Sequence, residues 1–263
     1  MARAYLTIDD SPSSRMDDLI DAFVEKEIPA LFFCRGDLLE KNPIMALKAV
    51  ERGFVLGNHA YSHERASNEN YEDFVDQIEK TERLIDNVYS MAGIEKPGQY
   101  FRFPHLDRGC GSWIMDFEAF DVKQRTLVKS IFTEGLNVVS AKQPDDAARE
   151  KMQKLQEYLK EGGYSVPFKG VNIDWYKDKQ VQAANDCLFT YSTADWMVTQ
   201  RHLGKWRYQS LDDLKNKIDY DQRLVDKKSV SVVLAHDQAE IIDTTLALID
   251  HMLDRKITFL PFA

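Results

Sequence analysis

The hydrophobic residues in the first hundred positions follow two alternating periods. Short apolar runs that suit buried strands occur at 5–8, 30–33, 54–57 and 100–104. Between these runs, apolar residues recur at helical spacing over 15–26, 43–52 and 71–92. Gly93 follows the last of these stretches and is placed to end a helix there. Because strands that alternate with helices without a break are typical of parallel βαβ units, the pattern predicts an α/β fold.

The pattern loosens in the second half of the chain. Elements predicted there are helices at 117–134, 144–161, 179–188, 211–223 and 241–255, and strands at 136–139, 171–174, 230–235 and 257–260. No linker, low-complexity segment or internal repeat divides the chain. We therefore expect a single domain over 1–263 with a helical insertion at roughly 107–170. That insertion would rim a groove, form an oligomer contact or simply pack, and the sequence leaves these roles open.

Several polar residues follow the predicted strands directly. They are Asp9, Asp10, His59, Arg102, Asp174 and His236. In a parallel barrel the carboxyl ends of the strands converge on one mouth, where side chains distant in sequence meet. Since fewer than eight strands are predicted with clear patterns, the expected architecture is a distorted (β/α) barrel with an incomplete strand set.

Composition and charge limit the kinds of molecule that the protein is expected to bind. The chain has 43 acidic and 34 basic residues, a net charge of −9, and no basic cluster, which argues against nucleic acid or an anionic membrane as partner. No apolar run has the ~20 residues of a membrane helix, and no signal peptide is evident. The sequence thus predicts a cytoplasmic protein, or an exported one if a leader has been removed. The three cysteines lack the spacing of a disulfide framework or a thiolate zinc site.

His59 and His63 are spaced i and i+4, which on a helical turn puts both rings on one face. A strand-end carboxylate would complete an Asp-His-His set that leaves positions open for water and substrate, as a catalytic metal site needs. Imidazole and carboxylate ligands favour Zn²⁺, with Co²⁺, Mn²⁺ and Ni²⁺ as alternatives. Taken singly, each motif has a simpler interpretation: the two histidines as a solvated turn, and Asp9 or Asp10 as a helix cap.

Five motifs taken in order resemble the polysaccharide deacetylases, esterases that remove N-acetyl groups from chitin oligosaccharides and peptidoglycan and O-acetyl groups from xylan. The motifs are Thr7-Ile8-Asp9-Asp10-Ser11-Pro12, His59-Ala60-Tyr61-Ser62-His63, Arg102-Phe103-Pro104, Asp174-Trp175 and Leu234-Ala235-His236. They span residues 7 to 236. One of them is a weak signal, but five in the family's order are a strong one.

The resemblance implies a role for each matching residue. Asp9 would be the general base, held by Arg102, while Asp10, His59 and His63 would bind one divalent metal. His236 would be the general acid and Asp174 would orient it. We expect the metal and Arg102 to lower the pKa of Asp9, and a carboxylate to raise that of His236. The substrate pocket would be formed by Trp175, Leu234, Pro104 and His105.

The chain also departs from the family pattern. Ser11 replaces a glycine, Ala60 replaces a Ser or Thr that braces the histidine loop, and His105 replaces an aromatic residue whose backbone N–H helps to stabilise the oxyanion.

The function that the resemblance implies is metal-dependent hydrolysis of an N-acetyl, or alternatively O-acetyl, group on an amino sugar or polysaccharide. Two alternatives stay open: a hydrolase of the same fold that cleaves a non-sugar C–N amide, and a non-catalytic carbohydrate-binding protein. The oligomeric state is left open as well.

Overall fold

Parallel strands form the centre of the computed structural model, which describes residues 1–110, 121–126 and 144–262. The sheet order is β3-β2-β1-β5-β4, with β6 paired to the start of β1, and every pairing between named strands is parallel. The strands are β1 (Arg3–Ser11), β2 (Ala30–Cys34), β3 (Val55–Asn58), β4 (Tyr191–Ser192), β5 (Val230–His236) and β6 (Thr258–Phe259). The predicted α/β class is therefore confirmed.

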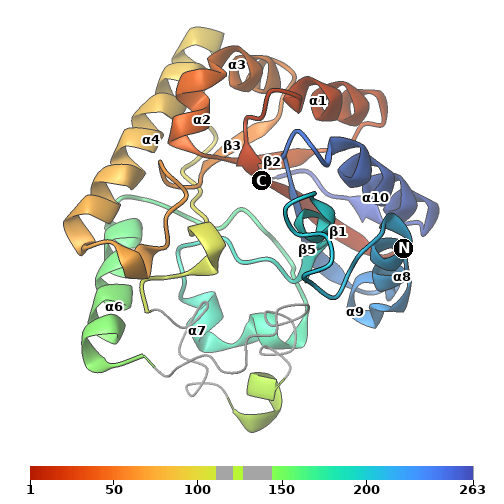
Figure 1. The fold of residues 1–263 in the computed structure, drawn as a ribbon. Coiled ribbons are helices and arrows are strands. Elements are labelled where there is room, and N and C mark those ends of the chain that lie inside the picture. The colour runs from red at the N-terminus through yellow and green to blue at the C-terminus, as the bar shows by residue number, and fades with distance from the viewer. Residues whose placement is uncertain (111–120, 127–143, 263) are drawn as a thin grey trace.

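Helices surround these strands in a ring (Figure 1). They are α1 (Met16–Glu25), α2 (Gly36–Lys41), α3 (Pro43–Glu51), α4 (Tyr71–Ala92), α6 (Asp146–Glu161), α7 (Lys179–Gln182), α8 (Leu211–Tyr220), α9 (Gln222–Val225) and α10 (Ile242–Asp254). Short 3₁₀ helices are η1 (Ala66–Asn68), η2 (Pro104–Leu106), η4 (Asp174–Lys177) and η5 (Asp195–Val198). In the part of the chain that the structure describes, no helix has the length and hydrophobicity to cross a bilayer.

The long helix α4 matches its predicted range. Asn70 caps it, because its side chain accepts a hydrogen bond from the backbone N–H of Asp73 at 2.8 Å. Gly93 ends it in the left-handed conformation at φ 66°, which glycine adopts without steric cost.

Several predicted elements differ from the observed ones. Residues 100–104 make only an isolated bridge, between Asn58 and Phe101, instead of a regular strand. Residues 171–173 are irregular and Asp174 begins η4. The Asn172 backbone N–H donates to the Val230 carbonyl at 3.3 Å, but the Val230 N–H donates to the Asn172 side chain, at 2.8 Å, so no regular ladder forms. The helix predicted at 179–188 ends at Gln182. Of the helix predicted at 117–134, residues 122–126 are described and helical, whereas the strand predicted at 136–139 lies outside the described residues.

Side chains of successive β1 residues point to opposite faces of the sheet and pack in two separate hydrophobic clusters. Ala4, Leu6 and Ile8 pack in the main core. The residues between them point the other way, so Tyr5 joins a second cluster around Trp175. Asp9 continues the series that faces away from the main core. The strand therefore delivers its first carboxylate to the opposite side of the sheet from the helices of that core.

Candidate active site

A cavity of about 1020 Å³ lies at the carboxyl ends of the strands. The residues expected at a site that line it are Asp9, Asp10, His59, His63, His105, Leu234 and His236. Four other expected residues, Pro104, Arg102, Asp174 and Trp175, do not line it. Because the strands are parallel, β1, β3 and β5 bring residues more than two hundred positions apart into one cavity.

Both carboxylates of the Asp9-Asp10 pair reach the cavity although adjacent strand residues normally face opposite sides. The pairing register of β1 with β2 shifts between Ile8 and Ser11, and Asp10 has φ 64°. This left-handed backbone redirects the second side chain, and Asp is one of the residue types that tolerate it.

The turn that carries His59 and His63 is not helical, so the i, i+4 argument predicted the right pair for the wrong reason. Ala60 and His63 have φ 55° and 64°, and the turn brings the two rings to a centroid distance of 5.1 Å. The Asn58 side chain accepts a hydrogen bond from the Ala60 N–H at 2.9 Å. This bond braces the turn where the family uses a Ser or Thr.

The amino end of α2 holds the same turn from outside. The backbone N–H groups of Gly36 and Asp37 donate to the carbonyls of Ala60 and Tyr61 at 3.0 and 3.1 Å. A Cβ at position 36 would come within 2.3 Å of the Tyr61 ring, so this close approach requires glycine.

The ligand atoms of Asp10, His59 and His63 lie within 4.8 Å of one another, close enough to hold one metal ion. Asp10 Oδ1 is buried without a hydrogen-bond donor, although His63 Nε2 lies 3.1 Å away. His59 Nδ1 lies 2.7 Å from the Arg102 carbonyl, which only accepts; the ring proton is therefore on Nδ1 and the Nε2 lone pair is free for a ligand bond. These residues thus fit a divalent cation.

Burial keeps both histidines neutral, because it lowers the pKa of His59 to about 3 and that of His63 to about 4. Burial acts to raise the pKa of Asp10, but the neighbouring imidazoles and a 2.7 Å hydrogen bond from Gln238 Nε2 outweigh it, so that pKa is lowered. Neutral imidazoles and an ionised carboxylate are the forms in which these groups bind metals.

Arg102 supports Asp9 from below the cavity. Its Nη1 donates to Asp9 Oδ1 at 2.7 Å and to Thr7 Oγ1 at 2.8 Å, and its Nε donates to the Cys187 carbonyl at 2.7 Å. Asp9 Oδ2 is left facing His59 Nε2 at 3.7 Å. Burial nevertheless raises the pKa of Asp9 despite the ion pair with Arg102. The protein's own groups therefore shift the pKa of Asp9 in the direction opposite to the one expected from the sequence.

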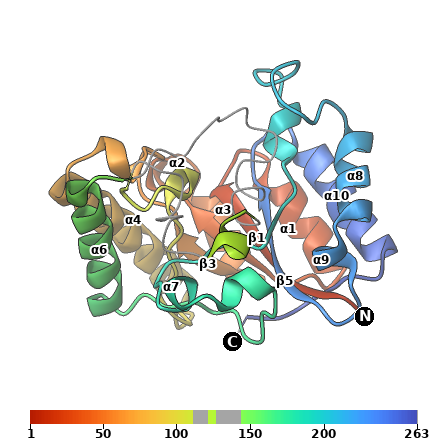
Figure 2. The same cartoon turned by 90° about the horizontal axis from the view of Figure 1, so that it is seen from below.

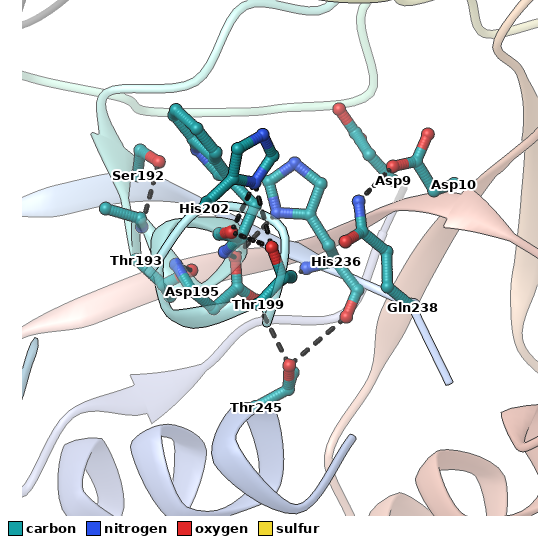
Figure 3. A network of polar contacts seen from close by, with 12 residues as sticks. Asp9, Asp10, Ser192, Thr193, Asp195, Thr199, His202, His236, Gln238 and Thr245 are labelled. Carbon is teal, nitrogen blue, oxygen red and sulfur yellow. Dashed lines mark hydrogen bonds and ion pairs between the residues drawn. The ribbon is translucent and has the colours of Figure 1, made fainter. Parts of the chain in front are cut away.

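Asp195, and not Asp174, holds His236 (Figure 3). Its Oδ1 lies 2.6 Å from His236 Nδ1, and its Oδ2 accepts from the His236 backbone N–H at 2.8 Å and from Thr245 Oγ1 at 3.1 Å. The prediction for Asp174 is wrong, because its side chain is 92% exposed and, among the residues that the structure describes, pairs only with Lys177, at 3.6 Å. Burial acts to lower the pKa of His236, but Asp195, with smaller contributions from Asp10 and Asp9, raises it to about 9.

The assignment of Trp175 to the pocket is also wrong, since this residue is fully buried in the cluster around Tyr5. Trp196 lines the cavity instead. The chain contains two Asp-Trp pairs, and the second, Asp195-Trp196, follows the short strand β4. That second Asp-Trp pair was the sequence feature from which Asp195 and Trp196 could have been predicted as site residues. Pro104 is buried in η2 outside the cavity lining.

Leu234 and His105 line the cavity as expected. His105 has φ 52°, its ring centroid lies 4.4 Å from that of His63, and its Nε2 lies 3.2 Å from the His63 carbonyl oxygen.

Residues 2–110 match the family model described as polysaccharide deacetylase. The resemblance to the polysaccharide deacetylases is confirmed. A peptidoglycan-N-acetylglucosamine deacetylase of Bacillus cereus is 32% identical over 92 residues, which are 35% of this chain and 34% of that protein. A bifunctional xylanase/deacetylase of Pseudobutyrivibrio xylanivorans is 30% identical over 102 residues, or 38% of this chain and 16% of the relative. The matched segment thus spans about a third or less of these polysaccharide deacetylase relatives.

Solved structures extend the similarity in fold to the whole chain. The catalytic domain of a peptidoglycan N-acetylglucosamine deacetylase from Eubacterium rectale has a TM-score of 0.60 at 16% identity, covering 100% of this chain and 89% of that one. A CE4 family pseudoenzyme from Bacillus anthracis has a TM-score of 0.56 at 14% identity, covering 98% and 64%. Since the second relative is a pseudoenzyme, the fold of the polysaccharide deacetylases does not by itself establish catalysis.

Proposed function

We propose that this protein is a metal-dependent deacetylase that hydrolyses the N-acetyl group of an amino sugar in a carbohydrate chain. The observation that carries this proposal is the meeting, in one cavity, of an Asp-His-His ligand set, a carboxylate held by a buried arginine, and an imidazole held by a buried carboxylate. The relatives named as peptidoglycan-N-acetylglucosamine deacetylases support the choice of an N-acetyl substrate.

Asp10, His59 and His63 would hold the cation, with zinc as the ion that best suits this ligand set. When bound, the cation would polarise the acetyl carbonyl and promote ionisation of a water. Gln238 fixes Asp10 by donating to Oδ2, so that Oδ1 stays available as the ligand atom.

Asp9 would take the proton from the attacking water through Oδ2, because Arg102 already occupies Oδ1. Its raised pKa makes the carboxylate a stronger base than an exposed aspartate. Leu234, beside His236 on β5, would contact the acetyl methyl group.

His236 would protonate the departing amine. Asp195 holds Nδ1, which leaves Nε2 as the atom that faces the substrate. An amine is a poor leaving group until it is protonated, so an imidazole that is positively charged at neutral pH suits this task.

The test is acetate release by protein loaded with Zn²⁺, measured on N-acetylglucosamine oligomers, peptidoglycan, acetylated xylan and simple non-sugar acetamides. We expect release from one of the acetylated glycans and none after chelation. Release from the acetamides alone would favour the alternative of a non-sugar C–N hydrolase. Glycan binding without any release would favour a non-catalytic carbohydrate-binding protein.

A further inference from the structure

The chain between η5 and α8 forms a loop, residues 199–208, which we call the rim loop. Figure 2 shows it projecting beyond the carboxyl ends of the strands, above α8. Nothing in the metal and proton-transfer chemistry above uses its residues. Yet His202 and Trp206 of this loop line the same cavity as Asp9 and His236.

The rim loop builds an aromatic wall together with Trp196 of η5. The Trp196 ring centroid lies 5.0 Å from that of His202 and 5.6 Å from that of Trp206, and all three contacts are edge-on, including 6.2 Å between His202 and Trp206. The two tryptophans pack on the main core on one side and remain partly exposed. The wall is therefore supported from behind and open toward the cavity.

His202 is fixed in one tautomer by its neighbours. Its Nδ1 lies 3.1 Å from the Trp196 carbonyl oxygen and 2.8 Å from Thr199 Oγ1, and the Thr199 hydroxyl itself donates to that carbonyl at 2.9 Å. A carbonyl only accepts, so Nδ1 carries the proton and Nε2 keeps a lone pair. Figure 3 shows Nε2 turned away from Thr199, and within the described residues it has no hydrogen-bond partner.

We propose that this wall is a second sugar subsite, in which Trp206 and Trp196 contact the C–H face of a pyranose ring and His202 Nε2 accepts a hydrogen bond from one of its hydroxyls. A sugar presents this combination of an apolar face and polar edges, and binding sites pair apolar walls with a few placed polar groups in the same way. The inference rests on the proposed function and adds to it the residues that would bind a second sugar of the carbohydrate chain.

Chain-length dependence of kcat/KM tests the subsite. The substrates are N-acetylglucosamine, its dimer to pentamer, and an aryl acetate, which carries no second sugar. We expect the wild type to prefer the oligomers over the monosaccharide. In Trp206→Ala, the ratio of kcat/KM on the tetramer to that on the aryl acetate should fall about tenfold, mainly through KM. Trp206→Phe keeps an aromatic ring and should recover most of this ratio.

Two variants of His202 separate recognition from support of the loop. His202→Asn places an amide where Nδ1 was and removes the Nε2 acceptor, so the ratio should fall about three- to tenfold. His202→Gln places an amide oxygen near the Nε2 position and should retain more of the ratio than His202→Asn. Leu203→Ala is the matched control, because Leu203 is 52% exposed in the same loop and does not line the cavity.

Equal activity of the wild type on monosaccharide and tetramer would overturn the subsite, as would equal losses on tetramer and aryl acetate in the variants. If Trp206→Ala does not fold, the comparison of His202→Asn with His202→Gln decides alone. Should the wild type release no acetate from any substrate, the proposed function fails. The subsite is then judged by binding of the tetramer through tryptophan fluorescence, where unchanged affinity in His202→Asn would overturn it.

Discussion

Two histidines that line the cavity have opposite protonation states. His59, after β3, has its Nδ1 on a neutral carbonyl, and burial lowers its pKa to about 3. His236, at the end of β5, has its Nδ1 on the Asp195 carboxylate; burial acts to lower its pKa, but Asp195 together with Asp10 and Asp9 raises it to about 9. Burial disfavours the charged form of both rings, so the comparison teaches that the partner on Nδ1, a neutral carbonyl or a carboxylate, sets the difference between their protonation states.

The largest expected effect comes from the residues proposed to bind the metal. Removing the metal with a chelator should abolish acetate release, and restoring Zn²⁺ should recover it. His59→Ala should bind well under one equivalent of metal, because it removes one of the three proposed ligands. Elemental analysis of protein purified without a histidine tag measures this. Full metal occupancy in His59→Ala would remove His59 from the ligand set.

Asp9→Asn separates the base from the neighbouring ligand. The amide cannot accept a proton, so turnover should fall by about 10²–10⁴ while metal content stays near that of the wild type. Asp10→Asn should lose metal as well as rate, since Asp10 would offer a ligand oxygen. Metal content and kcat measured on both variants compare them directly. Equal metal loss in the two would show that their roles are misassigned.

Asp195→Asn tests the partner of the proposed acid, His236. It should lower kcat/KM on an acetylated amino sugar by about tenfold to 10², and much less on an aryl acetate. The neutral amide does not stabilise the protonated imidazole of His236 as a carboxylate does. The aryl acetate is less affected because its phenolate leaves with little help from an acid. Asp174→Asn is the matched control, because Asp174 is exposed and touches neither His236 nor the cavity. A larger loss in Asp174→Asn than in Asp195→Asn would contradict the assignment.

Gln238→Leu probes the support of the metal ligand. It removes the donor to Asp10 Oδ2 and keeps a side chain of similar size, so metal affinity should fall about tenfold. Competition with a fluorescent chelator measures the Kd for Zn²⁺. An unchanged Kd would mean that Asp10 does not depend on this hydrogen bond.

The smallest expected effect is a shift in the pH profile. The pKa of His236 is raised to about 9, so its acid form predominates below that pH and is lost as pH rises through it. Amide hydrolysis should therefore fall above about pH 9, at most tenfold per pH unit, whereas aryl acetate hydrolysis should lack this limb. Asp195→Asn should move the limb to lower pH, because Asp195 is the group that raises the pKa; Asp9 and Asp10 contribute less. A limb at the same pH in this variant would point to another group.

Residues next to long, regular elements could be located from sequence alone. Helical spacing gave the range of α4, apolar runs gave β1, β2 and β5, and parallel strands imply one mouth for their carboxyl ends. Asp9, Asp10, His59, His63 and His236 were therefore expected together, and they line one cavity. The periodicity of hydrophobic residues depends only on neighbouring positions, so it can be read from the sequence without the tertiary structure.

Tertiary structure decided the partner of His236. Asp174-Trp175 and Asp195-Trp196 are the same dipeptide, and only the pairing of the two-residue strand β4 beside β5 places Asp195, and not Asp174, against the imidazole. A strand this short leaves no periodic signal, and the irregular turns around it are held by long-range contacts such as Thr193 N–H to the Leu234 carbonyl at 2.8 Å. The left-handed conformations of Asp10 and His63 are fixed in the same way, by what packs around them, and they leave Asp10, His59 and His63 with side-chain oxygen and nitrogen atoms within 4.8 Å of one another.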